Sequence, residues 1–181
     1  MLHFDFDTSE IARLANEFGA SPKQLELAYA RALRRTASTL RTQARKGLRE
    51  TMGLRSAKEI RRRMYGFKFR KGDGMGSVRM WFGFNDLRAS AFKGRPRRTP
   101  RGASIAGREV EGAFVGKNRA GQRTIMRRAG RRAYPIAEAR IPVDDAAEAF
   151  VEDEVFDQVE EIFFRNFRAE IKARTIYEVG K

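Results

Sequence analysis

The sequence predicts a single α+β domain over residues 1–181, with a long N-terminal amphipathic helix and a long C-terminal helix packed on a mostly antiparallel β-sheet. Three observations support this fold class. Apolar residues recur every three or four positions near both ends of the chain, which is the spacing of a helix with one buried face. Between these segments, apolar and polar residues alternate in short runs separated by turn residues, as they do in strands. An arginine- and proline-rich stretch interrupts these runs and predicts an extended basic loop.

The N-terminal segment predicts a strand and two helices. Apolar and polar residues alternate over residues 2–6, as in a half-buried strand. Residues 8–18 have helical spacing and are followed by a glycine, so they predict a short helix. Ser21 and Pro22 fit the N-cap and the first position of a long helix that ends near Gly53. Its apolar face consists of Leu25, Tyr29, Leu33, Ala37, Leu40, Ala44 and Leu48.

The next segment predicts a short helix and a β-hairpin. Ser56 and Glu59 fit a capping box at the start of a helix that runs toward Met64. Aromatic residues alternate with glycine and basic residues over 65–70, and a second apolar run occupies 78–84. The glycine-rich residues between these two runs predict the turn of a hairpin.

Residues 94–107 have the composition of a loop. They contain two prolines, three glycines and four arginines, with Ile105 as the one large apolar residue. Because such a segment buries too little apolar surface to fold alone, we expect an extended basic arm. Three further strands are predicted at residues 110–115, 124–128 and 134–141.

The C-terminal segment predicts a long helix after Pro142. Acidic residues at its start and basic residues near its end complement the helix dipole. Residues 175–181 form a short C-terminal extension, in which 175–179 alternate like a strand that could pair with a neighbouring sheet edge, although a frayed terminus is the more common state of such a segment. The apolar stripe of the helix consists of Val151, Val155, Val159, Ile162, Phe163, Phe167 and Ile171.

The net charge of +15 is distributed unevenly along the chain. Residues 1–54 contain 9 basic and 6 acidic side chains, residues 55–140 contain 24 and 6, and residues 141–181 contain 5 and 11. A basic segment of this density attracts polyanions or acidic protein surfaces and repels a copy of itself. The acidic C-terminal segment could neutralise it, either in the same subunit or in the next.

Residue types that carry catalysis or bind cofactors are scarce. There is no cysteine, and the single histidine is His3 in the predicted N-terminal strand, which excludes thiol chemistry and a Ser-His-Asp arrangement. The glycine-rich residues 72–76 lack the lysine of a phosphate-binding loop. We therefore expect no enzyme, no catalytic or metal-ligating residue and no cofactor. A signal peptide and a stretch of about 18 apolar residues are also missing, so we expect a soluble protein that does not enter a membrane.

Basic and aromatic side chains are interleaved at residues 65–70 and again over 81–93, a combination found in nucleic-acid-binding sheets. A basic nucleic-acid-binding protein is therefore an alternative function, although strand aromatics more often belong to the core. A metal-dependent nuclease that uses Asp144 and Asp145 ranks below it, because such sites need carboxylates from several elements.

Several short motifs follow one another in a fixed order between residues 25 and 175. They are Ala-Arg-Ala-Leu-Arg-Arg-Thr-Ala at 30–37, Leu-Arg-Thr at 40–42, Gly-Ala-Phe-Val at 112–115, Ala-Gly-Gln at 120–122, Met-Arg-Arg-Ala-Gly at 126–130 and Arg-Arg-Ala-Tyr-Pro-Ile at 131–136. In this order, followed by an acidic-to-basic helix, the sequence resembles the minor tail protein Z family of lambda-like bacteriophages.

The resemblance implies a structural protein of the virion that completes the head-proximal end of the tail and contributes to the head-tail junction, or neck. It implies a homo-oligomeric ring, of six copies, that contacts the tail terminator, the tail tube or the connector. Such a protein is present in the host cytoplasm during assembly and in the virion afterwards. Non-specific contact with DNA in the channel is a further partner that this position implies.

Candidate interface residues are the basic side chains of the predicted arm and of the segments that follow it. They are Arg95, Arg97, Arg98, Arg101, Lys117, Arg119, Arg131 and Arg132. The candidate acidic counter-surface consists of Asp144, Asp145, Glu148 and Glu152. Opposite charges on different segments suit contacts between the subunits of a ring, in which two different surfaces of each subunit meet.

Overall fold

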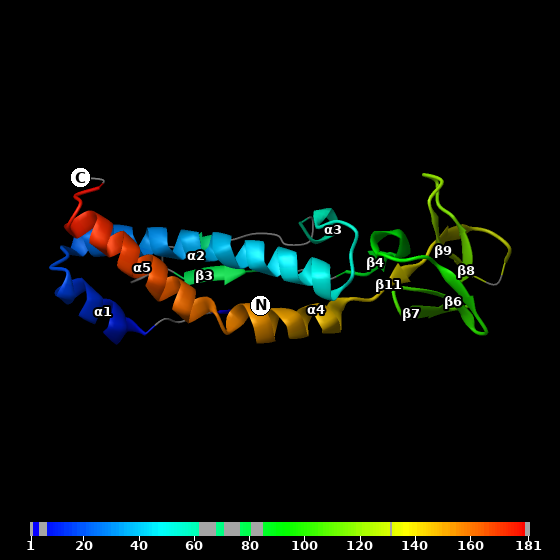
Figure 1. Cartoon of the computed structure of the whole chain (residues 1–181), viewed down its shortest axis with the longest axis horizontal. Helices are drawn as coiled ribbons and strands as arrows, with labels where there is room; N and C mark the ends of the chain where they lie inside the picture. Colours follow the sequence, from blue (N-terminus) through cyan, green and yellow to red (C-terminus); the bar gives the residue numbers. More distant parts are fainter. Residues whose placement is uncertain are drawn as a thin grey trace. The chain divides into compact units, whose positions relative to one another are not determined.

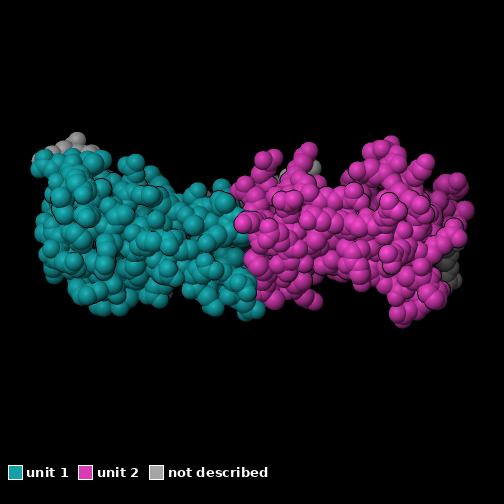
Figure 2. All heavy atoms as spheres, in the orientation of Figure 1, with its two compact units in different colours: residues 1–44, 64–82, 151–181 teal, residues 45–63, 83–150 magenta. Residues whose placement is uncertain are grey.

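A computed structural model of the chain describes residues 2–3, 7–61, 68–70, 77–80, 85–130 and 132–179. The chain forms two compact units (Figure 2). Unit 1 contains residues 1–44, 64–82 and 151–181, and unit 2 contains residues 45–63 and 83–150. Helices and antiparallel strand pairs together confirm the predicted α+β class. The expectation of a single domain stays a prediction.

The two N-terminal helices, α1 (Thr8–Glu17) and α2 (Pro22–Thr51), begin at residues that cap them (Figure 1). A carboxylate oxygen of Asp7 accepts a hydrogen bond from the backbone N of Ser9 at 2.8 Å. Ser21 and Gln24 form a capping box, with the Ser21 backbone N donating to Gln24 Oε1 at 2.9 Å and the Gln24 backbone N donating to Ser21 Oγ at 3.4 Å. Both predicted helices are confirmed.

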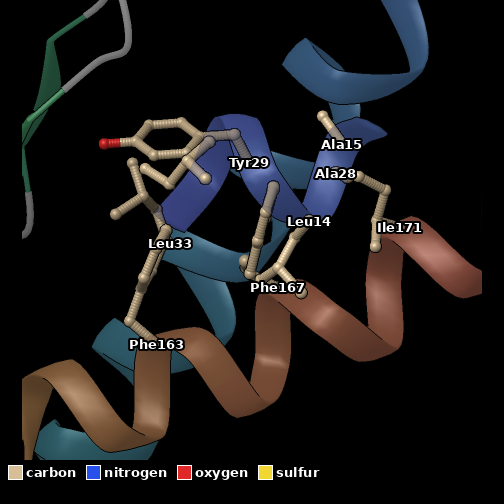
Figure 3. Packing of buried hydrophobic residues seen from close by; sticks show 10 residues of the cluster. Leu14, Ala15, Ala28, Tyr29, Leu33, Phe163, Phe167 and Ile171 are labelled. Carbon is tan, nitrogen blue, oxygen red and sulfur yellow. The ribbon is translucent and has the colours of Figure 1, made fainter. Parts of the chain in front are cut away.

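The core of unit 1 lies where α1, α2 and α5 (Val159–Thr175) meet (Figure 3). Tyr29 packs edge-on against Phe163 with ring centroids 5.4 Å apart, and Phe163 stacks on Phe167 at 5.8 Å. The apolar stripes that the sequence indicates therefore face one another. The buried cluster consists of Ile11, Leu14, Ala15, Ala28, Tyr29, Ala32, Leu33, Phe163, Phe167 and Ile171.

The predicted C-terminal helix is divided into three segments. They are α4 (Asp144–Phe150), the π-helical segment η2 (Val151–Phe156) and α5. Val151, Val155 and Val159 are all buried and recur every four residues, which exceeds the 3.6 residues of an α-helical turn. The wider π turn keeps these valines on one face of the segment.

Unit 1 also contains a three-stranded antiparallel sheet in the order β1-β3-β2. Its strands are β1 (Leu2–His3), β2 (Lys68–Arg70) and β3 (Ser77–Met80). The pairing of β2 with β3 confirms the predicted hairpin. The rest of the predicted N-terminal strand and most of the interleaved aromatic residues, at 4–6, 65–67 and 81–84, lie outside the described residues.

The described residues of unit 2 form three small sheets, so the single sheet that the sequence predicts is divided. The first has the order β5-β6-β7, the second β10-β9-β8, and the third pairs β4 with β11. The described helical segments of unit 2 are the end of α2, α3 (Lys58–Arg61), η1 (Ala89–Ala91) and α4. The strands are β4 (Leu87–Arg88), β5 (Arg97–Thr99), β6 (Gly102–Ile105), β7 (Arg108–Glu111), β8 (Phe114–Lys117), β9 (Arg123–Arg128), β10 (Ile136–Glu138) and β11 (Arg140–Ile141).

Two of the predicted strands are each split by a local change of direction. The strand predicted at 110–115 is divided between β7 and β8, because Gly112 has a φ of 65° that turns the chain. The strand predicted at 134–141 is divided between β10, which pairs with β9, and β11, which pairs with β4. The strand predicted at 124–128 is confirmed as β9.

Residues 94–107 differ from the predicted extended loop. Arg97–Thr99 pairs with Gly102–Ile105 as a hairpin, and β6 pairs on its other side with β7. Ala103 and Ile105 are buried on the inward side of β6. The segment is stable as a hairpin because neighbouring strands bury its two inward side chains, which composition alone does not indicate.

The terminal strand predicted at 175–179 is also absent from the described structure. Residue 175 is the last residue of α5, and the backbone N of Val179 donates back to Ala173 O at 3.1 Å. The guanidinium of Arg174 donates to Val179 O at 3.2 Å. These bonds fold the segment onto the end of its own helix.

Candidate basic interaction surface

The β8–β9 hairpin places two cations opposite each other. Lys117 and Arg123 are directly paired in the antiparallel register. Both side chains are exposed. Like charges that face each other across two strands destabilise the pairing. The loop end of this hairpin therefore has a charge arrangement that a bound anion would relieve.

The loop that joins the two strands is held in one shape by Asn118. Its side-chain oxygen accepts hydrogen bonds from the backbone N of Ala120 at 3.1 Å and of Gln122 at 3.0 Å. Gly121 adopts a φ of 76°, which closes the turn. The positions of Lys117 and Arg123 are thus fixed by the loop as well as by the strands.

Two adjoining hollows lie against this end of the hairpin. The first has a volume of about 630 Å³ and is lined by Arg55, Gly94, Arg95, Pro96, Arg97, Gln122 and Arg123. The second has a volume of about 660 Å³ and is lined by Pro96, Arg97, Arg98, Val115, Gly116, Lys117 and Arg123. They share Pro96, Arg97 and Arg123, so they form one continuous basic surface. We call this surface the basic hollows.

Arg55 is anchored to the segment that leads into the basic hollows. Its Nε donates to Phe92 O at 2.7 Å, and one of its terminal nitrogens donates to Gly94 O at 3.1 Å. Its backbone N donates to Ala91 O at 2.9 Å. The guanidinium is therefore held in place before any ligand binds, which reduces the entropy that binding would cost.

The cations of the basic hollows have no acidic partner among the described residues. Neither lining includes a carboxylate from that part of the chain. The nearby carboxylate of Glu109 pairs instead with Arg101, at 3.1 Å, and accepts a hydrogen bond from the hydroxyl of Thr99. The Thr99 hydrogen bond, with Arg101 as a further cause, lowers the pKa of Glu109 below its ordinary value of 4.5.

A third hollow, of about 430 Å³, lies beside β10 and the hairpin loop. Its cations are Arg88, Arg119 and Arg140, and Arg88 faces Arg140 across the β4–β11 pair. Glu138 also lines it, and one oxygen of that carboxylate accepts hydrogen bonds from the Ser90 backbone N at 2.6 Å and from Thr124 Oγ1 at 3.0 Å. Unlike the basic hollows, this site contains its own acidic group.

The structure brings together some of the predicted interface residues and separates others. Arg95, Arg97, Arg98 and Lys117 line the basic hollows, whereas Arg119 lines the third hollow. Arg101 pairs with Glu109, and Arg132 is exposed. Arg131 lies outside the described residues.

Sequence reasoning missed two cations of the basic hollows. Arg123 could have been found, because a hairpin with a five-residue loop at 118–122 places it opposite Lys117. Arg55 carries no such signal, since it lies about forty positions before Gly94, the nearest of the other lining residues, and is held there through tertiary hydrogen bonds.

The four predicted acidic residues are all exposed. Asp144, Asp145 and Glu148 lie on α4 in unit 2, and Glu152 lies on η2 in unit 1. Within the described part of the chain, none of the four forms a salt bridge with the predicted basic residues. Their charges are therefore accessible to another molecule, and their role as a counter-surface stays a prediction.

A family model described as prophage minor tail protein Z (GPZ) matches residues 85–177. The chain belongs to this family. The match includes the motifs between 112 and 136 and the C-terminal helical segments, and it begins after the motifs at 30–42. Apart from Arg55, every residue that lines the basic hollows lies within the part that matches minor tail protein Z.

Membership in the minor tail protein Z family makes the chain a structural protein of a bacteriophage tail, which acts in the virion together with other tail proteins. No curated protein and no solved structure matches the sequence. Among the described residues, no helix is long and apolar enough to cross a bilayer.

Proposed function

We propose that this tail protein completes the head-proximal end of the tail and forms part of the neck as a subunit of a homo-oligomeric ring, with six copies. Its neighbours would be the tail terminator, the tail tube or the connector. Family membership supports a tail role, and the uneven distribution of basic and acidic residues along the chain supports assembly. The protein would assemble in the host cytoplasm and remain in the virion.

The observation that carries the ring proposal is the exposed acidic surface that has no basic partner within the described chain. A ring forms when two different, complementary surfaces of each subunit meet. Two strongly basic surfaces repel each other, whereas the carboxylates of Glu148 and Glu152 would attract a basic surface of the next subunit. Charge complementarity of this kind would also fix the order in which subunits join.

The test is the assembly state of a Glu148→Lys and Glu152→Lys double variant, measured by native mass spectrometry with and without the cognate tail-tube or terminator protein. Both residues lie outside the first turn of α4, so the helix start stays intact. A Glu17→Lys and Glu50→Lys variant makes the same charge change at exposed positions elsewhere. We expect rings from the wild type and the control, and loss of rings from the test variant.

A wild-type chain that stays monomeric beside its tail partners, together with full infectivity of phage that lack its gene, would overturn the ring proposal. Equal loss of assembly in both double variants would show that net charge, and not the acidic surface, governs association.

The alternative function, a basic nucleic-acid-binding protein, is favoured by the cations that line the basic hollows of unit 2. It predicts that the free protein binds nucleic acid tightly with a steep salt dependence. Weak binding that vanishes near physiological salt would count against this alternative.

A further inference from the structure

We infer that the basic hollows of unit 2 bind the sugar-phosphate backbone of double-stranded nucleic acid. The inference deepens the proposed function, because it names what this surface would contact in a neck through which DNA passes. Six cations from three parts of the chain converge there: Arg55, Arg95, Arg97, Arg98, Lys117 and Arg123.

The first argument is electrostatic. Lys117 and Arg123 face each other across two strands, and the described residues supply neither of them with a carboxylate. A protein can retain such a destabilising arrangement when a bound ligand offsets the repulsion between the two charges, and an anion bound between the two side chains would do so. The fixed hairpin loop and the anchored Arg55 keep these charges close together without the ligand.

The second argument concerns which anion fits. Five of the six cations are arginines, whose planar guanidinium can donate two parallel hydrogen bonds to one phosphate. The two hollows adjoin and share Arg97 and Arg123, so they would receive successive anionic groups of one chain-like ligand. A phosphate backbone presents such a series.

The third argument separates nucleic acid from an acidic protein. Protein interfaces usually contain a buried apolar or aromatic centre, and the described linings supply just Pro96, which is buried, and Val115 as apolar side chains. The same linings include no aromatic side chain, which single-stranded nucleic acids use for base stacking. The chemistry therefore favours backbone contacts to a duplex, without sequence preference.

The experiment measures binding of the purified full-length chain to a labelled DNA duplex of mixed sequence by fluorescence anisotropy, over a series of salt concentrations. The test variant is Arg97→Gln, Lys117→Gln and Arg123→Gln. The matched control, Lys23→Gln, Arg168→Gln and Lys172→Gln, removes the same charge from exposed positions in unit 1. Circular dichroism and urea unfolding verify that both variants fold.

For the wild type we expect tight binding to the duplex and weaker binding to a single strand of the same length. Each phosphate contact contributes about −0.9 to the slope of log K against log salt, so the test variant should reduce the magnitude of that slope by about 3. Its affinity at low salt should fall at least tenfold, while the control stays within about threefold of the wild type. Removing the facing cations should also raise the urea midpoint of the free test variant.

Three results would overturn the inference. The first is an equal loss of affinity in both variants, which would mean that binding follows net charge alone. The second is that polyglutamate displaces the labelled duplex as effectively as unlabelled duplex does, which would indicate an acidic protein as the ligand. The third is unchanged DNA binding by the test variant.

The failure of this inference and the failure of the proposed function are distinguishable. Duplex binding is measured on the free chain and does not depend on ring formation or incorporation into tails. Suppose that the test variant keeps its DNA affinity but loses ring assembly. Suppose also that adding Glu148→Lys and Glu152→Lys to the test variant reduces ring assembly no further. The basic hollows are then a subunit interface. The inference then fails while the ring proposal stands.

Discussion

Glu170 connects three arginines in unit 1. Its carboxylate lies 2.8 Å from a terminal nitrogen of Arg35, 3.6 Å from one of Arg174 and 3.8 Å from Nε of Arg31. The side chains of Glu170 and Arg174 are 10% and 7% exposed, so this pair is largely removed from water. Arg174 in turn holds the C-terminal segment through Val179 O. One buried acid thus supports the contact between α2 and α5.

Replacing Glu170 with Gln should therefore destabilise the protein. The change leaves the buried guanidinium of Arg174 without a counter-charge, and removing one partner of a buried ion pair costs about 3–5 kcal/mol. Glu161→Gln is the matched control on the same helix, because Glu161 is 79% exposed and lies 4.0 Å from Arg165. It should change the free energy of unfolding by less than about 0.5 kcal/mol. Urea unfolding measures both, and equal effects would contradict the role of Glu170.

The pKa of Glu109 gives a second prediction at this scale. The hydroxyl of Thr99 is the main cause that holds this pKa below 4.5, so Thr99→Val should raise it toward that value. Since the folded pKa is depressed, the associated stability is present above pH 4.5 and is lost as the pH falls through the folded value. A carbon-detected NMR titration of Glu109 in both proteins measures the shift. An unchanged midpoint in the variant would show that Thr99 is not the cause.

Single elements were predictable where their signals are local. The predicted N-cap Ser21 forms hydrogen bonds with Gln24 where α2 begins, whereas Asp7, which caps α1, was not predicted as a cap. The β5–β6 hairpin at 97–105 was not predictable, because it depends on pairing with β7 and on burial of Ala103 and Ile105. The sequence left the terminal segment open between a strand and a frayed end, because its alternating pattern does not reveal the bonds of Arg174 and Val179 to their neighbours.

Gly102 is a test of how closely the strands of the first sheet in unit 2 are packed. A Cβ atom there would lie 2.3 Å from Val110 O and 3.0 Å from Gly112 N, both of which are backbone atoms that cannot rotate away. Gly102→Ala should therefore lower the free energy of unfolding by about 1–3 kcal/mol. Gly130→Ala is the control, because nothing lies within 4 Å of its added Cβ. Thermal unfolding that is the same for both variants would contradict the packing.

The helical core of unit 1 gives the second prediction for an element. Phe167 is fully buried and stacks on Phe163, so Phe167→Ala would leave a cavity between α5 and the N-terminal helices. We expect a loss of about 3–5 kcal/mol in the free energy of unfolding. Leu27→Ala on α2 removes a side chain that is 41% exposed and should cost far less. A comparable loss in both would show that α5 does not pack on this core.

For the molecule as a whole, the sequence revealed the sign of each charged segment but not which charges converge. Arg95, Arg97, Arg98 and Lys117 were identifiable as interface candidates from composition, and they do line the basic hollows. The pairing of Arg101 with Glu109 was not identifiable from composition, because it depends on the register in which β6 pairs with β7. Convergence is a property of tertiary structure, and local patterns do not contain it.

Charge also links the two proposals at this scale. The acidic residues Glu148 and Glu152 would contact a neighbouring subunit, while the basic hollows would remain for the DNA that passes through the neck. The net charge of +15 is then the excess that this second contact requires. A ring of such subunits would contact the sugar-phosphate backbone of the DNA and would have no preference for base sequence.

The most direct test of the central claim is the position of the chain in the virion, determined by cryo-electron microscopy of the phage that encodes it. The account predicts density for this fold at the head-proximal end of the tail, repeated around the tail axis, with the basic hollows facing the DNA channel. Density at the distal end of the tail, or virions that lack the chain altogether, would contradict it.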